Sequence, residues 1–164
     1  MALVVEDGTG KADANSFVER AEYIAFAALR GVTVANDAAA DVELVKATDK
    51  ILTMCFKGNP TVAGQALPFP RHEENYNFKL VYPDDEVPVA IKRGQMLLAM
   101  AVHDGIDLSP NVVGGIAIKR EKIGPIETEY DTATTQDSPT LPLAMSAFAP
   151  FTCGQGGRVS VLRV

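Results

Sequence analysis

Residues 87–105, VPVAIKRGQMLLAMAVHDG, constrain the fold of this chain most, because they form its longest run that water accommodates poorly. Apolar side chains recur along it every three or four residues, which predicts a buried α-helix. Its apolar residues are Val87, Ala90, Ile91, Gly94, Leu97, Leu98, Ala101 and Val102, with Met96, Ala99 and Met100 widening the face. Pro88 suits the first turn, the acidic residues 84–86 lie near the positive end of the helix dipole, and Gly105 can end the helix. At about 27 Å, such a helix can cross a small domain, and the charges at residues 92–93 argue against a membrane span.

Two further amphipathic helices precede this stretch. Ser16 and Glu19 have the spacing of a capping box, and the periodic run that begins there predicts a helix ending at Gly31. Its expected buried face consists of Phe17, Ala21, Ile24, Ala25, Ala28 and Leu29. Residues 36–37 can cap a second helix that ends at Gly58. Its expected buried stripe consists of Leu44, Val45, Thr48, Ile51, Leu52, Cys55 and Phe56.

The remaining segments differ in character. Residues 59–83 contain four prolines and neither a helical nor a strand period, which predicts a long ordered or semi-ordered loop. Two alternating runs flank residues 124–125 and predict a β-hairpin at about residues 113–131. Residues 141–151 carry a short helical stripe of Leu141, Ala144, Met145 and Phe148.

Together these patterns predict a mainly α fold, a small bundle of three main helices plus a short C-terminal helix, with a protruding β-hairpin. Strand-like segments are expected at both ends, over residues 1–5 and 158–164. We expect a helical connector domain over residues 1–150 and a flexible C-terminal arm over residues 151–164, because glycines loosen the chain before the last strand. That last strand can pair with the N-terminal run of its own chain, or add to the sheet of a partner.

Composition limits what such a chain can do. Its 164 residues suit one domain, and the net charge of −6 argues against a protein that mainly grips phosphates. Two cysteines, Cys55 and Cys153, are too few for a disulfide framework and fit a reducing compartment. The N-terminus lacks the features of a signal peptide, which predicts a cytoplasmic product.

Several side-chain groups resemble catalytic or metal motifs, but each has a simpler structural explanation. The HEEN run at residues 72–75 lacks the second histidine of a zinc helix and fits a solvated charged loop, as does Arg71 beside it. The acidic residues 84–86 could hold a cation, although a helix-dipole role is favoured. The CGQGG run at residues 153–157 lacks the ending of a phosphate loop and suits a hinge. We therefore expect no enzyme, no cofactor and no metal site.

Several local signatures follow one another in an order that composition alone does not produce. They are ANSF at residues 14–17, RG at 30–31, KATD at 46–49, QALPFPR at 65–71, VP at 87–88 and KREKIGPIE at 119–127. In these signatures the chain resembles phage head-tail connector proteins of the group labelled DnaT-like single-stranded-DNA-binding proteins. It departs from that pattern at Phe69, where tryptophan is expected, and in an insert at residues 73–80.

The resemblance implies a structural virion protein without catalytic activity. It implies a ring of about a dozen copies that sits on the portal protein, meets a downstream neck or tail-completion protein, and extends the DNA channel. Double-stranded DNA would pass through the lumen without specific binding, and no membrane is involved. The expected location is the virion neck, with the host cytoplasm during assembly. The group label itself implies the alternative, a single-stranded DNA-binding protein.

The hairpin and the C-terminal arm are the expected contact surfaces towards neighbouring subunits and the portal. A two-stranded ribbon alone is marginal in water, and a free edge strand calls for a partner. The expected contact residues are Ile116, Ile118, Lys119, Arg120, Lys122, Ile126, Glu127, Tyr130, Arg158, Val159, Val161, Leu162 and Val164. The basic run at residues 119–122 is expected at the hairpin tip, where it can touch DNA or an acidic neighbour, or remain a solvated turn.

Overall fold

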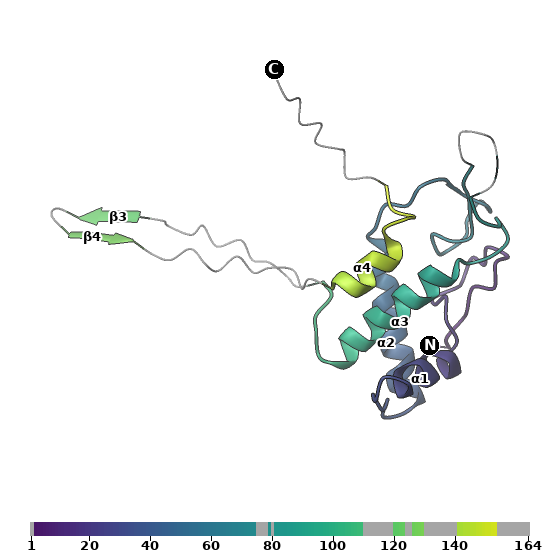
Figure 1. The fold of residues 1–164 in the computed structure, drawn as a ribbon, viewed down its shortest axis with the longest axis horizontal. Helices are drawn as coiled ribbons and strands as arrows, with labels where there is room; N and C mark the ends of the chain where they lie inside the picture. Colours follow the sequence, from purple (N-terminus) through teal and green to yellow (C-terminus); the bar gives the residue numbers. More distant parts are fainter. Residues whose placement is uncertain are drawn as a thin grey trace, which may run out of the picture.

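The computed structural model describes residues 2–74, 79, 81–109, 120–123, 126–129 and 141–153. Within these residues the fold is mainly α, as predicted, with four helices and one hairpin of four-residue strands (Figure 1). The helices are α1 (Arg20–Ala28), α2 (Asp37–Leu52), α3 (Val89–His103) and α4 (Pro142–Phe148). The strands are β1 (Asn59–Pro60), β2 (Arg71–His72), β3 (Arg120–Ile123) and β4 (Ile126–Glu129).

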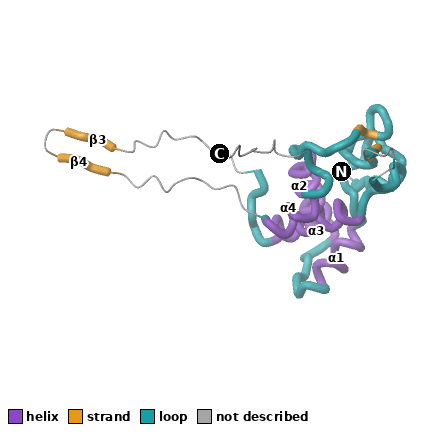
Figure 2. Tube along the Cα trace, turned by 45° about the horizontal axis from the view of Figure 1, so that its top comes forward, coloured by secondary structure: helices purple, strands orange, loops and turns teal. Residues whose placement is uncertain are grey.

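Helix α3 is the centre of the bundle, as the apolar stretch predicted. It contacts α1, α2 and α4, and Figure 2 shows the helices gathered together with the long loop and β1 and β2 at one end. Its buried residues are Ile91, Gly94, Gln95, Met96, Leu98, Ala99 and Ala101. At Gly94 the backbone meets the ring of Phe148 so closely that a Cβ would lie 2.3 Å from its Cζ atom. The absence of a side chain at Gly94 therefore sets how closely α4 can approach α3.

Helix α1 does not have the expected capping box of Ser16 and Glu19. The helix begins at Arg20, its N-cap residue is Glu19, and no side chain caps it. Ser16 is buried instead, and its hydroxyl donates a hydrogen bond to the carbonyl of Val18 at 2.8 Å. The predicted face is confirmed at Phe17, which is fully buried, and at Ile24, which packs against the core. It was wrong for the rest, because the helix starts later and buries Tyr23 and Ala27 while Leu29 is 86% exposed.

Helix α2 follows its prediction at the start and departs from it at the end. The side chain of Asn36 accepts a hydrogen bond from the backbone N–H of Ala39 at 2.9 Å, which is the expected N-cap. The helix ends at Leu52, well before Gly58. Phe56 is buried from the loop that follows, whereas Leu52 is 50% exposed. The apolar pattern of the sequence continues beyond Leu52 because the loop after the helix also places Phe56 in the core.

One guanidinium holds the described part of the loop between α2 and α3. Arg71 donates hydrogen bonds to the backbone carbonyls of Phe56, Lys57, Gly58 and Pro68 at 2.5–3.2 Å. These bonds attach the loop to the end of α2, beside the two-residue ladder of β1 and β2. Arg71 is thus a structural residue, in contrast to the solvated charge that its sequence context predicted.

An aromatic cluster fills the space under this loop. Phe69, which precedes a cis peptide bond to Pro70, is fully buried. Its ring lies 5.1–6.4 Å from four neighbouring rings, a range typical of favourable aromatic pairs. The four neighbours are Phe17, Phe56, Tyr82 and Phe151. The cluster joins parts of the chain that are far apart in the sequence.

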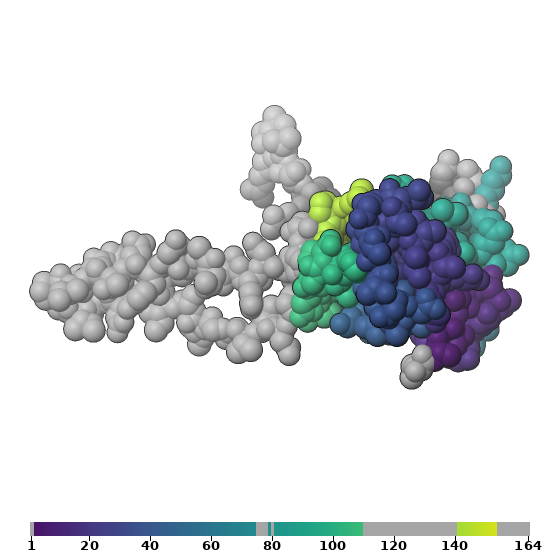
Figure 3. Space-filling view, turned by 90° about the horizontal axis from the view of Figure 1, so that it is seen from below, coloured from purple at the N-terminus to yellow at the C-terminus, as the bar shows by residue number. Residues whose placement is uncertain are grey.

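A buried carboxylate organises the N-terminal turn. The carboxylate of Glu6, 1% exposed, accepts hydrogen bonds from the backbone N–H groups of Gly8, Gly10 and Lys11 at 2.7–2.9 Å. Gly8 has φ +104°, and a Cβ there would lie 1.9 Å from the carbonyl oxygen of Asp85. Figure 3 accordingly shows the N-terminal residues in purple beside the teal residues that precede α3. The expected N-terminal strand is limited to one parallel bridge between Val5 and Ser16.

The folded body extends through Cys153, three residues into the expected flexible arm. A disulfide links Cys153 to Cys55, and the backbone N–H of Cys153 donates to the carbonyl of Cys55 at 2.9 Å. The sequence did not predict this pairing, because the two cysteines lie 98 positions apart and no local pattern links them. Residues 154–164, and with them the strand-like segment at 158–164, lie outside the described residues.

Gln95 links α3 to two other parts of the core. Its carboxamide nitrogen donates to the hydroxyls of Ser16 at 2.9 Å and Thr48 at 2.8 Å. Its carbonyl oxygen accepts from the backbone N–H of Phe17 at 2.9 Å. The side chain is completely buried, so these bonds form out of reach of water. The N-terminal segment, α2 and α3 are thereby joined by a single side chain.

We expect that opening the disulfide destabilises the protein. The bond closes a loop between residues 98 positions apart, and closing a loop of that length removes much entropy from the unfolded chain. Cys55→Ser, Cys153→Ser and the double variant should each lose on the order of 2–4 kcal/mol of unfolding free energy, measured by urea denaturation. Equal stability of the wild type with and without reductant would contradict this expectation.

The Gln95 network should also contribute measurably to stability. Gln95→Leu keeps a similar volume but leaves the buried N–H of Phe17 without its acceptor, which should lower the unfolding free energy by about 1–3 kcal/mol. Thr48→Val removes one partner only and should cost less, since the carboxamide keeps its other bonds. Chemical denaturation of both variants tests the order, and a Gln95→Leu variant as stable as the wild type would refute the role.

Candidate assembly and nucleic-acid surfaces

The predicted hairpin is present, and its two described strands are β3 and β4. Strand β3 pairs with β4 antiparallel, so that Lys122 lies opposite Glu127 and Arg120 opposite Glu129. The strands are joined by residues 124–125. Arg120 and Lys122 therefore lie in strand β3, whose last residue, Ile123, directly precedes residues 124–125.

The hairpin strands stand apart from the rest of the described structure. Among the described elements, β3 and β4 contact each other and none of the four helices (Figure 1). Four of the predicted contact residues lie in these strands: Arg120, Lys122, Ile126 and Glu127. The other predicted contact residues lie outside the described residues: Ile116, Ile118, Lys119, Tyr130, Arg158, Val159, Val161, Leu162 and Val164.

Several basic side chains of the helical body are occupied by partners within the chain. Arg20 bonds Asp41 through two nitrogens at 2.6 and 2.8 Å and Asp37 through a third at 2.9 Å. These hydrogen bonds, the one to Asp41 first, raise the pKa of Arg20 above its ordinary value. Lys11 pairs with Asp7 at 2.9 Å, and Arg71 is committed to backbone carbonyls.

The aromatic rings are likewise mostly committed to the core. Phe17, Phe69 and Phe148 are essentially unexposed. Phe26 is only partly buried, and the guanidinium of Arg30 lies 3.4 Å from the centre of its ring. A groove for single-stranded nucleic acid needs free rings beside free cations. The described part of the helical body gathers no such combination.

The HEEN run is tied to the acidic turn before α3. The Nδ1 atom of His72 lies 3.1 Å from Asp84, and its Nε2 atom lies 3.3 Å from Glu74. These two carboxylates, that of Asp84 first, raise the pKa of His72 above 6.5. Asp84 therefore pairs with His72, and the first turn of α3 itself contains no acidic residue. No set of three ligands suited to a metal ion occurs in the part of the chain that the structure describes.

Glu43 is the centre of another buried polar group, besides those of Glu6 and Gln95, and the sequence did not predict it. Its carboxylate accepts a hydrogen bond from the hydroxyl of Tyr23 at 2.6 Å and lies 2.9 Å from Nδ1 of His103. Burial and then the bond to Glu43 raise the pKa of Tyr23 well above its ordinary value. The group therefore links α1, α2 and α3.

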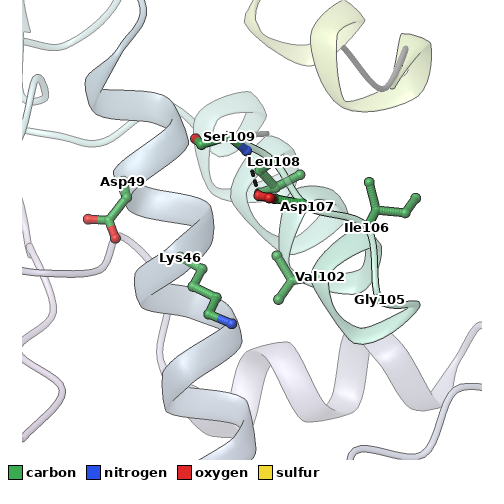
Figure 4. Close-up of a pocket in the computed structure, with 8 residues that line it drawn as sticks. All are labelled: Lys46, Asp49, Val102, Gly105, Ile106, Asp107, Leu108 and Ser109. Carbon is green, nitrogen blue, oxygen red and sulfur yellow. Dashed lines mark hydrogen bonds between the residues drawn. The ribbon is translucent and has the colours of Figure 1, made fainter. Parts of the chain in front are cut away.

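A shallow pocket of about 430 Å³ lies between α2 and the turn after α3 (Figure 4). Lys46 and Asp49 line it from α2, opposite residues 105–109. Its only drawn hydrogen bond runs from the backbone N–H of Ser109 to the side chain of Asp107, at 2.9 Å. Its lining contains the polar side chains of Lys46, Asp49, Asp107 and Ser109, and neither a histidine nor a cysteine.

The described part of the chain contains no helix that is both long and apolar enough to span a membrane.

The His72 contacts predict a pH dependence with a definite sign. Because the pKa of folded His72 is raised above 6.5, the contact stabilises the protein fully below that pH and less as the pH rises through the raised pKa. In an NMR titration, Asp84→Asn should lower the pKa of His72 more than Glu74→Gln does. A wild-type pKa at or below 6.5 would contradict the assignment.

Comparison with known proteins identifies one family. The family model described as "Putative DnaT-like ssDNA binding protein" matches residues 1–164, which is the whole chain. No curated protein and no solved structure gives a significant match. The chain therefore belongs to the family described as "Putative DnaT-like ssDNA binding protein".

Proposed function

We propose that this chain is a structural virion protein, a head-tail connector subunit that forms a ring on the phage portal. In this role it extends the DNA channel towards the tail and meets a downstream neck protein on its other side. The signatures at residues 14–127 that resemble connector proteins support the proposal. The family description does not mention this role, so it remains our inference from the sequence signatures and the arrangement of the chain.

One structural observation carries the proposal. Strands β3 and β4 pair only with each other and contact no helix of the described structure. A two-stranded ribbon of this length gains too little from its own pairing to be stable in water. It needs a surface to pack on, and in an assembly a neighbouring subunit or the portal supplies one.

The charge of the chain suits a DNA conduit. A net charge of −6 in each copy repels a phosphate backbone, and a ring multiplies that charge around its lumen. Double-stranded DNA can slide past such a wall because the carboxylates of the protein and the phosphates of the DNA repel each other.

Single-stranded DNA binding is the second candidate, and the family description favours it. This function needs a basic groove with stacking rings, whereas the described body buries Phe17, Phe69 and Phe148. The basic residues of the hairpin are the remaining place for it, with Arg120 and Lys122 on β3. We rank it below the connector role because overall acidity opposes phosphate binding.

The two functions can be separated with one purified protein. Electron microscopy of the protein mixed with its portal should show rings, and Ile126→Asp in β4 should abolish them while circular dichroism stays unchanged. Leu29→Asp is the matched control, because it adds the same charge at an exposed position of the helical body. Ring formation by Ile126→Asp would contradict the assigned contact.

The competing outcome is measured with labelled single-stranded oligonucleotides. We expect little change in fluorescence anisotropy at low salt. Tight binding that weakens steeply with salt, together with no ring on the portal, would reverse the order of the two candidates.

A further inference from the structure

The disulfide between Cys55 and Cys153 lies at the surface of the helical body. Cys55 is exposed and Cys153 is half-buried, so thiols in solution can reach the bond. Exposed disulfides are the ones that are readily reduced, whereas disulfides shielded in a core resist reduction. The sequence contains two cysteines in all, so the pair can open and close again without a competing partner in the same chain. These features are typical of a reversible disulfide.

Backbone hydrogen bonds hold the same two segments together beside the disulfide. The N–H of Lys57 donates to the carbonyl of Phe151 at 2.8 Å, and the N–H of Cys153 donates to the carbonyl of Cys55 at 2.9 Å. The Cα atoms of the two cysteines lie 5.4 Å apart, a usual separation for a disulfide. Because neither hydrogen bond involves sulfur, both can still form after reduction and bring the two thiols together again.

Without the covalent bond, these contacts can also separate. Lys57 is exposed, so its hydrogen bonds to the carbonyls of Phe151 and Pro150 compete with water. The half-buried ring of Phe151 lies 5.9 Å from the ring of Phe69 and 5.5 Å from that of Tyr82. Surface hydrogen bonds and one half-buried ring therefore allow this end of the body to detach and to return.

Helix α4 has an anchor of its own. Phe148, its last residue, is 1% exposed and packs against the backbone of Gly94 in α3. With the disulfide closed, the chain that leads to the predicted contact residues 158–164 leaves the body at Cys153. With the disulfide open, it can leave at the end of α4, five residues earlier, which adds about 17 Å of reach. The state of the bond thus sets how far from the body these residues can meet a partner.

We propose that Cys55 and Cys153 form a redox latch for the C-terminal end of the body, opened by a low-molecular-weight thiol such as glutathione. A thiolate of the reductant attacks the sulfur of Cys55, forms a mixed disulfide with it and releases Cys153 as a thiolate, which takes up a proton. A second reductant thiolate attacks the reductant's sulfur in the mixed disulfide. This step yields the disulfide of the reductant and releases Cys55, which is protonated in turn. Two electrons pass to the protein, and the reverse reaction closes the latch.

The redox latch goes beyond the connector role and does not depend on it. Its first test is to equilibrate the native wild-type protein in mixtures of reduced and oxidised glutathione. Alkylation with a maleimide coupled to polyethylene glycol, followed by gel electrophoresis, measures the fraction of open thiols. We expect millimolar reduced glutathione to open the bond without denaturant, and oxidised glutathione to close it again. A bond that opens only in the presence of urea would overturn the proposal.

NMR spectra of the two states test what opening changes. In the reduced protein, Overhauser contacts between the rings of Phe151 and Phe69 should lose about half their intensity or more, because the segment is detached part of the time. The amide resonances of α3 should keep their positions. Cys153→Ser should reproduce the reduced spectrum and should not respond to glutathione. Unchanged ring contacts after reduction, or a reduced protein whose α3 resonances collapse to unfolded positions, would refute the latch.

A variant of Phe151 tests the contacts that bring the thiols together. Because these contacts raise the effective concentration of one thiol near the other, Phe151→Ala should lower the equilibrium constant for closing the bond by about fivefold. Leu143→Ala is the matched control, since it shortens a 60% exposed apolar side chain of α4 outside the latch and should leave that constant unchanged. The same glutathione mixtures measure both variants. An equilibrium constant for Phe151→Ala equal to that of the wild type would contradict the proposal.

Discussion

The carboxamide of Gln95 is the interaction on which the arrangement of the helical body depends. It lies in the middle of α3, the helix that contacts each of the other three, and it bonds the N-terminal segment through Phe17 and α2 through Thr48. A buried amide left without partners costs far more than its bonds contribute when they form, so the network admits one relative placement of these segments. Apolar packing around it tolerates small shifts, whereas these hydrogen bonds do not.

The rest of the body is fixed to this frame by contacts that join distant parts of the chain. Arg71 attaches the long loop to the end of α2, and Phe69 fills the space beneath the loop with four aromatic neighbours. One of these neighbours, Phe151, lies two residues before Cys153, which is bonded to Cys55. The C-terminal end of the body is therefore held by a covalent bond and by aromatic packing at the same place. Residues such as Arg71 that look catalytic by type are used here to satisfy backbone carbonyls.

A body built this way has few basic or aromatic groups left for a nucleic acid. Its family description names single-stranded DNA binding, while its acidity and its buried rings suit a structural role. What the body does expose is apolar surface, at Val42 on one side and at Val89 and Leu143 on another. Grouped apolar side chains are typical of surfaces that bind another protein, which supports the proposed assembly role. This physical contrast is the reason to place assembly before DNA binding.

The sequence by itself determined the mainly α class, the central helix, the cap at Asn36, the hairpin and the short helix near residue 142. These features depend on local periodicity and on turn residues, which are written into neighbouring positions. Only the tertiary structure decided the use of Ser16, Gln95 and Arg71, and the pairing of Cys55 with Cys153. Each of these residues acts on a partner far along the chain, and no local pattern encodes that partner. Ser16 shows the difference most clearly: its spacing to Glu19 fits a helix cap, yet a bond to Gln95, 79 positions away, draws it into the core.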